Sequence, residues 1–176
     1  MTAAMRIVYL TGERVYLRPI VLADKDRAAA WHPGPFPLSA ARAESILKAE
    51  GEDAARRLVL VRREDDEVMG SVKVTSHDGF RRCWVEFHMS PSITDADADA
   101  LRAEALRLIM SWLRDRVEVM AVAVELAGDQ TETIAAAEDL GMVPAARLRE
   151  FFARPGGRVD QLVYQALNRR WEVKDA

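Results

Sequence analysis

The sequence predicts one α/β domain with a mixed central sheet and helices on both faces. The chain has 176 residues, of which 49% are hydrophobic and 30% charged, which is the composition of an ordinary globular domain with one core. Stretches in which apolar and polar residues alternate, as in strands, are interspersed with stretches whose apolar residues recur with the period of a helix. No internal repeat, linker or low-complexity tract divides the chain, so the predicted domain covers residues 1–176.

Hydrophobic periodicity and turn residues place the individual elements. In the first half we expect a strand at 15–20, helices at 22–31 and 40–49, and strands at 58–61, 68–75 and 84–89. Three prolines at positions 33, 35 and 37 end the first helix, and Ser39 caps the second.

The second half begins with an aspartate-rich segment, residues 94–99, which we expect to be a loop leading into a helix. The expected elements are a helix at 100–114 with one apolar stripe, a strand at 117–125, a helix at 131–140 that Gly141 ends, and strands at 146–153 and 159–167. A turn at 155–157 joins the last two strands.

Charge and cysteine content exclude several classes of protein. The net charge is -3 and the charges are mixed along the chain, so no basic stripe favours nucleic acid as a partner. Cys83 is the only cysteine, which excludes an internal disulfide, and no Cys/His cluster has zinc-like spacing, so no metal site is expected. The apolar run at 7–10 is too short for a signal peptide, and no stretch approaches the roughly 20 apolar residues of a membrane span. We expect a cytoplasmic protein.

Several short motifs follow one another in a recognisable order. They are Gly-Glu-Arg-Val-Tyr-Leu-Arg-Pro at 12–19, the helix at 24–31, Glu-Asp-Leu-Gly-Met at 138–142, and the spaced residues Leu148, Glu150, Gly157, Asp160, Tyr164 and Trp171. In this order and spacing the chain resembles the GNAT superfamily of N-acetyltransferases, particularly the subgroup that includes the ribosomal-protein alanine acetyltransferases.

The resemblance implies both a fold and an activity. The fold would be a mixed, mostly antiparallel sheet of about seven strands flanked by about four helices. The activity would be transfer of an acyl group, usually acetyl from acetyl-CoA, to a primary amine of a small molecule or peptide. Many similar proteins form dimers, so the resemblance also leaves open that this chain forms a homodimer.

One part of the chain departs from the family pattern. The family holds the CoA pyrophosphate with a loop written Arg/Gln-x-x-Gly-x-Gly/Ala before a helix, because a helix start binds anions. The best register places Asp95, Ala98 and Ala100 at the three motif positions, with Arg102 as a further phosphate-binding candidate. No glycine occurs between Phe80 and Val124.

The departure has three interpretations. Asp95, Asp97 and Asp99 are helix caps on an exposed loop, or they repel a diphosphate so that the loop no longer binds CoA in the family manner, or a cation bridges them to phosphate. A calcium loop is excluded, because Ala100 and Leu106 replace its required Gly and Glu.

A second departure stands where the family has Asn-x-x-Ser. Here the sequence reads Gln130-Thr-Glu-Thr133. The Gln130 amide remains a candidate for binding the pantetheine arm, and the Thr133 hydroxyl a candidate acid for the leaving thiolate. The alternative is that Gln130–Thr133 is simply a capping segment.

The expected strand at 84–89 carries candidate chemistry. Its alternation places Val85, Phe87 and Met89 on one face and Trp84, Glu86 and His88 on the other. Glu86 and His88, about 7 Å apart along the strand, are the candidate acid/base residues, unless they are satisfied structural groups. Trp84 is a candidate for substrate binding and Met89 for cofactor binding.

The remaining candidates come from other elements. Tyr164 on the closing strand is a candidate general acid, with packing as the alternative. Trp31, His32 and Phe36 follow the first helix, where similar proteins line the acceptor pocket, although a surface loop stiffened by proline explains them as well.

Three functions therefore remain open. The first is an acyl-CoA-dependent N-acyltransferase with altered cofactor binding. The second is a CoA-independent enzyme that uses Glu86 and His88 on a small metabolite. The third is a non-catalytic binding or partner protein.

Overall fold

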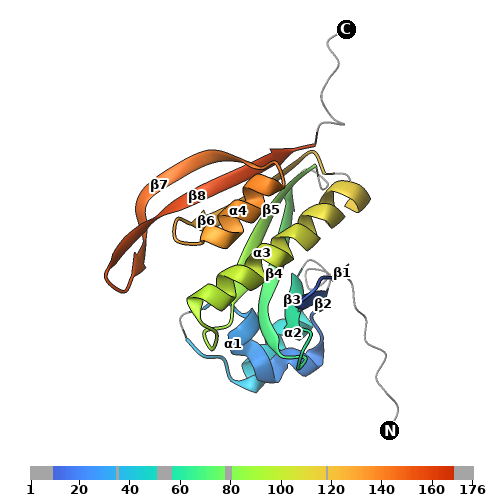
Figure 1. Cartoon of the computed structure of the whole chain (residues 1–176). Coiled ribbons are helices and arrows are strands. Elements are labelled where there is room, and N and C mark those ends of the chain that lie inside the picture. Colours follow the sequence, from blue (N-terminus) through green and yellow to red (C-terminus); the bar gives the residue numbers. More distant parts are fainter. Residues whose placement is uncertain (1–9, 35, 51–56, 78–80, 118, 169–176) are drawn as a thin grey trace. The chain divides into compact units, whose positions relative to one another are not determined.

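The predicted fold class is confirmed by the computed structural model, which describes residues 10–34, 36–50, 57–77, 81–117 and 119–168 (Figure 1). The described strands form a mixed sheet of eight in the order β1-β2-β3-β4-β5-β6-β8-β7, with four α-helices. Strand β5 (Arg82–Met89) pairs in parallel with β6 (Ala121–Ala127), whereas the other described pairings are antiparallel. The strand beyond the seven expected is β1 (Leu10–Thr11).

The described residues cluster in two compact units. Unit 1 comprises Met1–Lys73 and Phe87–Ala98, and unit 2 comprises Val74–Glu86 and Asp99–Ala176. The boundaries fall inside β4 (Val68–His77), β5 and α3 (Asp95–Trp112), so the chain does not divide into two successive domains.

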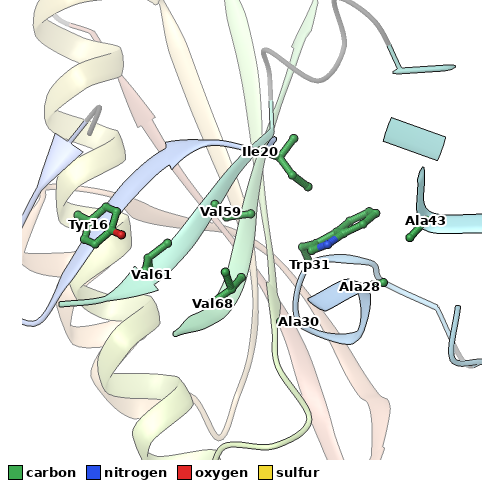
Figure 2. Packing of buried hydrophobic residues seen from close by; sticks show 9 residues of the cluster. All are labelled: Tyr16, Ile20, Ala28, Ala30, Trp31, Ala43, Val59, Val61 and Val68. Carbon is green, nitrogen blue, oxygen red and sulfur yellow. The ribbon is translucent and has the colours of Figure 1, made fainter. Parts of the chain in front are cut away.

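Unit 1 contains the N-terminal strands and the first helices. β2 (Val15–Pro19) and β3 (Arg57–Arg62) pair beside the first part of β4. The helical elements are η1 (Leu22–Arg27), α1 (Ala28–Trp31) and α2 (Ala40–Glu50). Their apolar side chains form one buried cluster that includes the fully buried Trp31 (Figure 2), and the other members of this cluster are Tyr16, Ile20, Ala28, Ala30, Ala43, Val59, Val61 and Val68.

The helix expected at 22–31 is a 3₁₀ turn followed by one α-helical turn. The buried Asp24 carboxylate accepts the Val21 N–H at 2.8 Å and both terminal nitrogens of Arg18 at 2.7 and 2.8 Å. The Trp31 indole N–H donates to the Asp24 carbonyl at 2.8 Å. These bonds tie the tight turn to strand β2, which explains why the helix starts in the 3₁₀ form.

Unit 2 contains β6, α4 (Thr131–Asp139), β7 (Val143–Arg154) and β8 (Gly157–Leu167), together with most of α3. Along β5 and β6 one set of side chains is buried and the alternating set is more exposed. The buried set includes Cys83, Val85, Val122, Val124 and Leu126. The other face carries Arg82, Trp84, Glu86, Ala121, Ala123 and Glu125.

Three element boundaries differ from those expected by three residues or more. Helix α3 begins at Asp95 rather than at residue 100, because Thr94 caps it. A π-helical turn, η3 (Leu113–Val117), follows α3, so β6 begins at Ala121 rather than at 117. Strand β7 begins at Val143 rather than at 146, and it carries a bulge in which Glu150 has a φ of 52°.

Candidate functional site

The aspartate segment is helix, not loop, and this corrects the sequence-based expectation. The Thr94 hydroxyl accepts the Asp97 N–H at 3.2 Å and donates to the Asp97 carboxylate at 2.9 Å. This N-cap makes Asp95 the first helical residue, with its negative charge at the positive end of the helix dipole. Asp95, Ala98 and Ala100, which were expected to form the loop, therefore lie in the first two turns of α3.

The two exposed aspartates of that turn lie in unit 1. Asp95 is exposed, and Asp97 forms a long ion pair with Arg14 at 3.9 Å. Ala98 is buried and does not offer its backbone to solvent. The short connection before the helix is instead Ser90–Thr94, in which the Ser90 and Ser92 hydroxyls lie 2.8 Å apart.

Asp99 belongs to unit 2 and performs a different task. Only 8% of this residue is exposed, and its carboxylate accepts the N–H groups of Glu132 at 2.8 Å and Thr133 at 3.2 Å. Asp99 therefore caps the start of α4 from the neighbouring helix α3. Arg102 lies 3.5 Å from the same carboxylate, in an ion pair whose two side chains are mostly buried.

The residues expected to contact the cofactor from α4 are already bonded within unit 2. Thr133 is fully buried, and its hydroxyl donates to the Asp99 carboxylate at 2.5 Å. The side-chain oxygen of Gln130 accepts the Ala127 N–H at 3.0 Å and closes the turn before α4. These contacts give both side chains a partner within unit 2, although neither side chain caps α4, and the expected roles of both residues at the cofactor stay predictions.

Tyr164 is bonded to the same helix. Its hydroxyl donates to the Glu138 carboxylate at 2.9 Å, and the residue is 5% exposed. Burial, followed by the bond to Glu138, raises the pKa of Tyr164 above its ordinary value. A phenol with a raised pKa holds its proton firmly, and here that proton points at a carboxylate.

A CoA pyrophosphate would need free N–H donors and little negative charge nearby. At the start of α3 one N–H is taken by Thr94, and the carboxylates of Asp95 and Asp97 lie in the first turn. Diphosphate beside two carboxylates is repelled. The residues present thus do not fit the group in the manner that the family resemblance implies.

The other candidates in unit 1 have mainly structural surroundings. Trp31 lies in the core, which argues against contact with a substrate, and His32 packs edge-on against it with ring centroids 5.9 Å apart. Phe36 is 79% exposed. The His88 ring lies 3.1 Å from the Ala29 carbonyl, and its pKa is lowered mainly by burial.

Met89 is half-buried beside the glycine of the neighbouring strand. A Cβ added to Gly70 would lie 3.1 Å from its sulfur. Its position at the end of β5 leaves the expected cofactor contact as a prediction.

The more exposed face of unit 2 offers a site of a different kind. Trp84, partly exposed on β5, lies opposite Ala123 of β6, which in turn pairs with Gln165 of β8. A cavity of about 360 Å³ lies here, lined by Arg82, Cys83, Trp84, Ala121, Val122, Ala123 and Gln165. Glu86 is the next residue of this face along β5, and it accepts a long hydrogen bond of 3.5 Å from Thr75.

Sequence reasoning missed Glu125 and Gln165, which share this face. Glu125 is exposed and follows Val124, the last residue of β6 that pairs with β5. The signal that could have found it is the alternation of apolar and other residues along β6, the same rule that identified Glu86.

Within the described part of the chain, no group of histidine, cysteine or acidic side chains has the arrangement of a metal site. None of the described helices combines the length and apolar character needed to cross a membrane.

Comparison with known proteins places the fold. No family model and no curated protein matches the chain. Among solved structures, an acetyltransferase of the GNAT family from Bacillus anthracis matches with a TM-score of 0.63 at 10% identity, over 90% of this chain and 98% of that one. A "putative acetyltransferase" from Sphaerobacter thermophilus DSM 20745 is 47% identical, with a TM-score of 0.73 over 93% of this chain and 99% of that one. The chain belongs to the GNAT acetyltransferase family.

More distant members of the family share only the fold with this chain. The ribosomal-protein-S5-alanine acetyltransferase from Vibrio fischeri matches with a TM-score of 0.69 at 13% identity, over 96% of this chain and 100% of that one. This GNAT chain thus has the family fold, whereas its subgroup remains a prediction.

Proposed function

We propose that the chain is an N-acyltransferase that transfers an acyl group from an acyl-CoA, with acetyl-CoA as the first choice, to a primary amine. Membership of the GNAT family supports the reaction class, and the unit 2 face that carries Trp84 and Glu86 supports an amine acceptor. The observation that carries the proposal is an exposed carboxylate, Glu86, two residues beyond Trp84 on the same face of β5, where Trp84 lines a cavity over the sheet.

Glu86 is the candidate general base. An amine enters as an ammonium ion, which has no lone pair and cannot attack a carbonyl carbon. The Glu86 carboxylate first holds this cation and then accepts the proton that it loses, directly or through one water. The Trp84 ring beside it provides an apolar wall and a favourable face for the cation.

The cofactor would supply an acyl carbon bonded to sulfur. Because the start of α3 carries Asp95 and Asp97, we propose that the acyl-CoA is held with less contribution from this helix than in the family pattern.

The test is a CoA-release assay with acetyl-CoA and a panel of primary amines of small molecules and peptides. We expect turnover with at least one amine, and a roughly 100-fold lower kcat for Glu86→Gln with little change in KM. Glu64→Gln is the matched control, because it removes one exposed carboxylate from a turn of unit 1. Equal activity of Glu86→Gln and the control would remove Glu86 from the proposal.

The second candidate is a GNAT-fold protein that has lost CoA binding and acts as a CoA-independent enzyme or as a binding protein. The observation in its favour is that backbone N–H groups at the start of both helices already donate to side chains of the chain itself. Thr94 accepts one at the start of α3, and Asp99 accepts two at the start of α4. Calorimetry with acetyl-CoA separates the two: heat of binding supports the transferase, and no heat up to millimolar cofactor supports the alternative. In that case the Asp95→Asn/Asp97→Asn double variant shows whether the two charges alone prevent binding.

A further inference from the structure

The last turn of the short helix α1 is held by side chains from three strands of unit 1. The Ala29 carbonyl oxygen lies 3.1 Å from Nε2 of His88 on β5. The Trp31 carbonyl accepts the Ser71 hydroxyl of β4 at 2.9 Å and a guanidinium N–H of Arg57 on β3 at 3.5 Å. A helix of four residues is not stable by itself, so its position depends on these bonds together with the packing of Trp31.

Of these three donors, only His88 changes its charge near neutral pH. A carbonyl oxygen can only accept a hydrogen bond, so Nε2 of His88 carries a proton, and in the neutral ring Nδ1 carries none. Uptake of a proton at Nδ1 leaves the bond to Ala29 in place but makes the ring a cation. The hydroxyl of Ser71 does not titrate in this range, and the guanidinium of Arg57 keeps its charge throughout.

The surroundings of His88 disfavour this cation. The ring is half-buried, and burial is the main cause that lowers its pKa, whereas the bond to Ala29 acts in the opposite direction. The positive charges of His32, which follows α1, and of Arg57 lower the pKa further. A protonated His88 therefore carries its charge at a cost that opening of the contact to water would relieve.

The other charged residues near this contact do not offset the cost. Helix α1 itself contains no charged residue. On β4 the nearest charged residue on the side of Ser71 is Lys73, which is exposed and also positive. On β5 Glu86 precedes His88 by two residues on the same side of the strand, but it is not among the groups that shift the pKa of His88.

We infer that the contact between His88 and Ala29 is a pH-sensitive switch in unit 1. While the ring is neutral, it holds the last turn of α1 on the sheet. When the ring takes up its second proton, this turn and residues 32–34 after it open more often. His88 is in this arrangement a positioning residue and not a catalytic one, and the inference does not depend on the proposed acyl transfer.

Two NMR measurements on the full chain, between about pH 8 and pH 5, test the switch. The first is the titration of the His88 ring, whose midpoint we expect below the ordinary value of about 6.5. The second is the protection from hydrogen exchange of the His32 backbone N–H, which donates to the Ala28 carbonyl at 2.8 Å. This protection should fall as the pH drops from about 6.5 through the midpoint, in total roughly tenfold for each pH unit between the two values.

Two substitutions separate the charge from the hydrogen bond. The amide of His88→Gln can still donate to Ala29 but takes up no proton, so the protection should match the wild-type value near pH 8 within about twofold and should not fall at low pH. His88→Ala removes the bond as well and should lower the protection about two- to tenfold even at high pH. His32→Gln is the matched control, because it removes the neighbouring histidine and leaves the contact, so the loss at low pH should persist.

Several outcomes would overturn the switch. They are a constant protection of the His32 N–H in the wild-type protein, a loss at low pH that His88→Gln leaves unchanged, and a loss that His32→Gln abolishes. A His88→Ala variant as well protected as the wild type near pH 8 would exclude the positioning role. If His88→Ala does not fold, the comparison of His88→Gln with the wild type decides alone.

Discussion

The role of Asp99 follows from its surroundings in the structure and not from its place in the sequence motif. In the sequence it is one of three alternating aspartates, but it alone is buried, and it accepts two N–H groups from α4 together with the Thr133 hydroxyl. Asp95 remains exposed at the start of the helix. A single motif therefore contains residues with unrelated roles.

Replacement of Asp99 should be costly for the fold. In Asp99→Ala, the Glu132 and Thr133 N–H groups and the Thr133 hydroxyl lose their acceptor while Thr133 stays buried. We expect the free energy of unfolding to fall by about 2–4 kcal/mol, measured by chemical denaturation. The matched variant Asp95→Ala should cost less than about 1 kcal/mol, because it removes only an exposed charge near a helix dipole. Equal losses in the two variants would contradict the capping role.

At the scale of elements, the approach of β4 to β5 depends on a glycine. A Cβ added to Gly70 would lie 2.4 Å from the His88 carbonyl oxygen, which is a backbone atom and cannot rotate away. Both residues belong to unit 1. The strands can approach this closely only because position 70 lacks a side chain.

Gly70→Ala should therefore lower the stability by about 2 kcal/mol or more, since two strands must move apart. Thermal and denaturant unfolding both measure this change. Gly128→Ala is the matched control, because its added Cβ would lie at ordinary contact distance, 3.6 Å, from the Asp160 carbonyl. A control variant as unstable as Gly70→Ala would show that the steric argument is wrong.

At the scale of the whole molecule, exposed ion pairs contribute to the response to acid. Hydrogen bonds from Lys25 and then Lys48 lower the pKa of Glu44 to about 2, and the hydrogen bond from Arg62 lowers the pKa of Asp65 to about 2. Carboxyls with a lower pKa in the folded state stabilise it above the unfolded pKa and lose this effect as the pH falls through the folded value.

We therefore expect the melting temperature to fall as the pH is lowered from about 5 to about 2, and to fall less steeply at about 1 M NaCl, which screens exposed pairs. Calorimetric melting at several pH values measures both trends. Glu44→Gln should flatten the slope, because it removes one of the titrating groups. A slope that neither salt nor this substitution changes would exclude these pairs as its cause.

Most elements could be predicted because their periodicity is local. The helix expected at 131–140 and the strand expected at 159–167 nearly coincide with α4 and β8, since alternation and stop residues report burial on one face. The start of α3 was missed because the segment of alternating Asp and Ala has no apolar stripe. Its first turn depends on the Thr94 cap.

The candidate site was predictable only in part, for a physical reason. Glu86 follows from the alternation within one strand, whereas Glu125 follows the last paired residue of another strand, and only the register of β5 with β6 places both on one face of the sheet. The sequence by itself determined the order of most elements and the resemblance to the GNAT family, because these depend on residues close together in the chain. The tertiary structure alone decided that Asp99 caps α4, that Thr133 is buried and that two glutamates share a face, because these contacts join residues more than thirty positions apart.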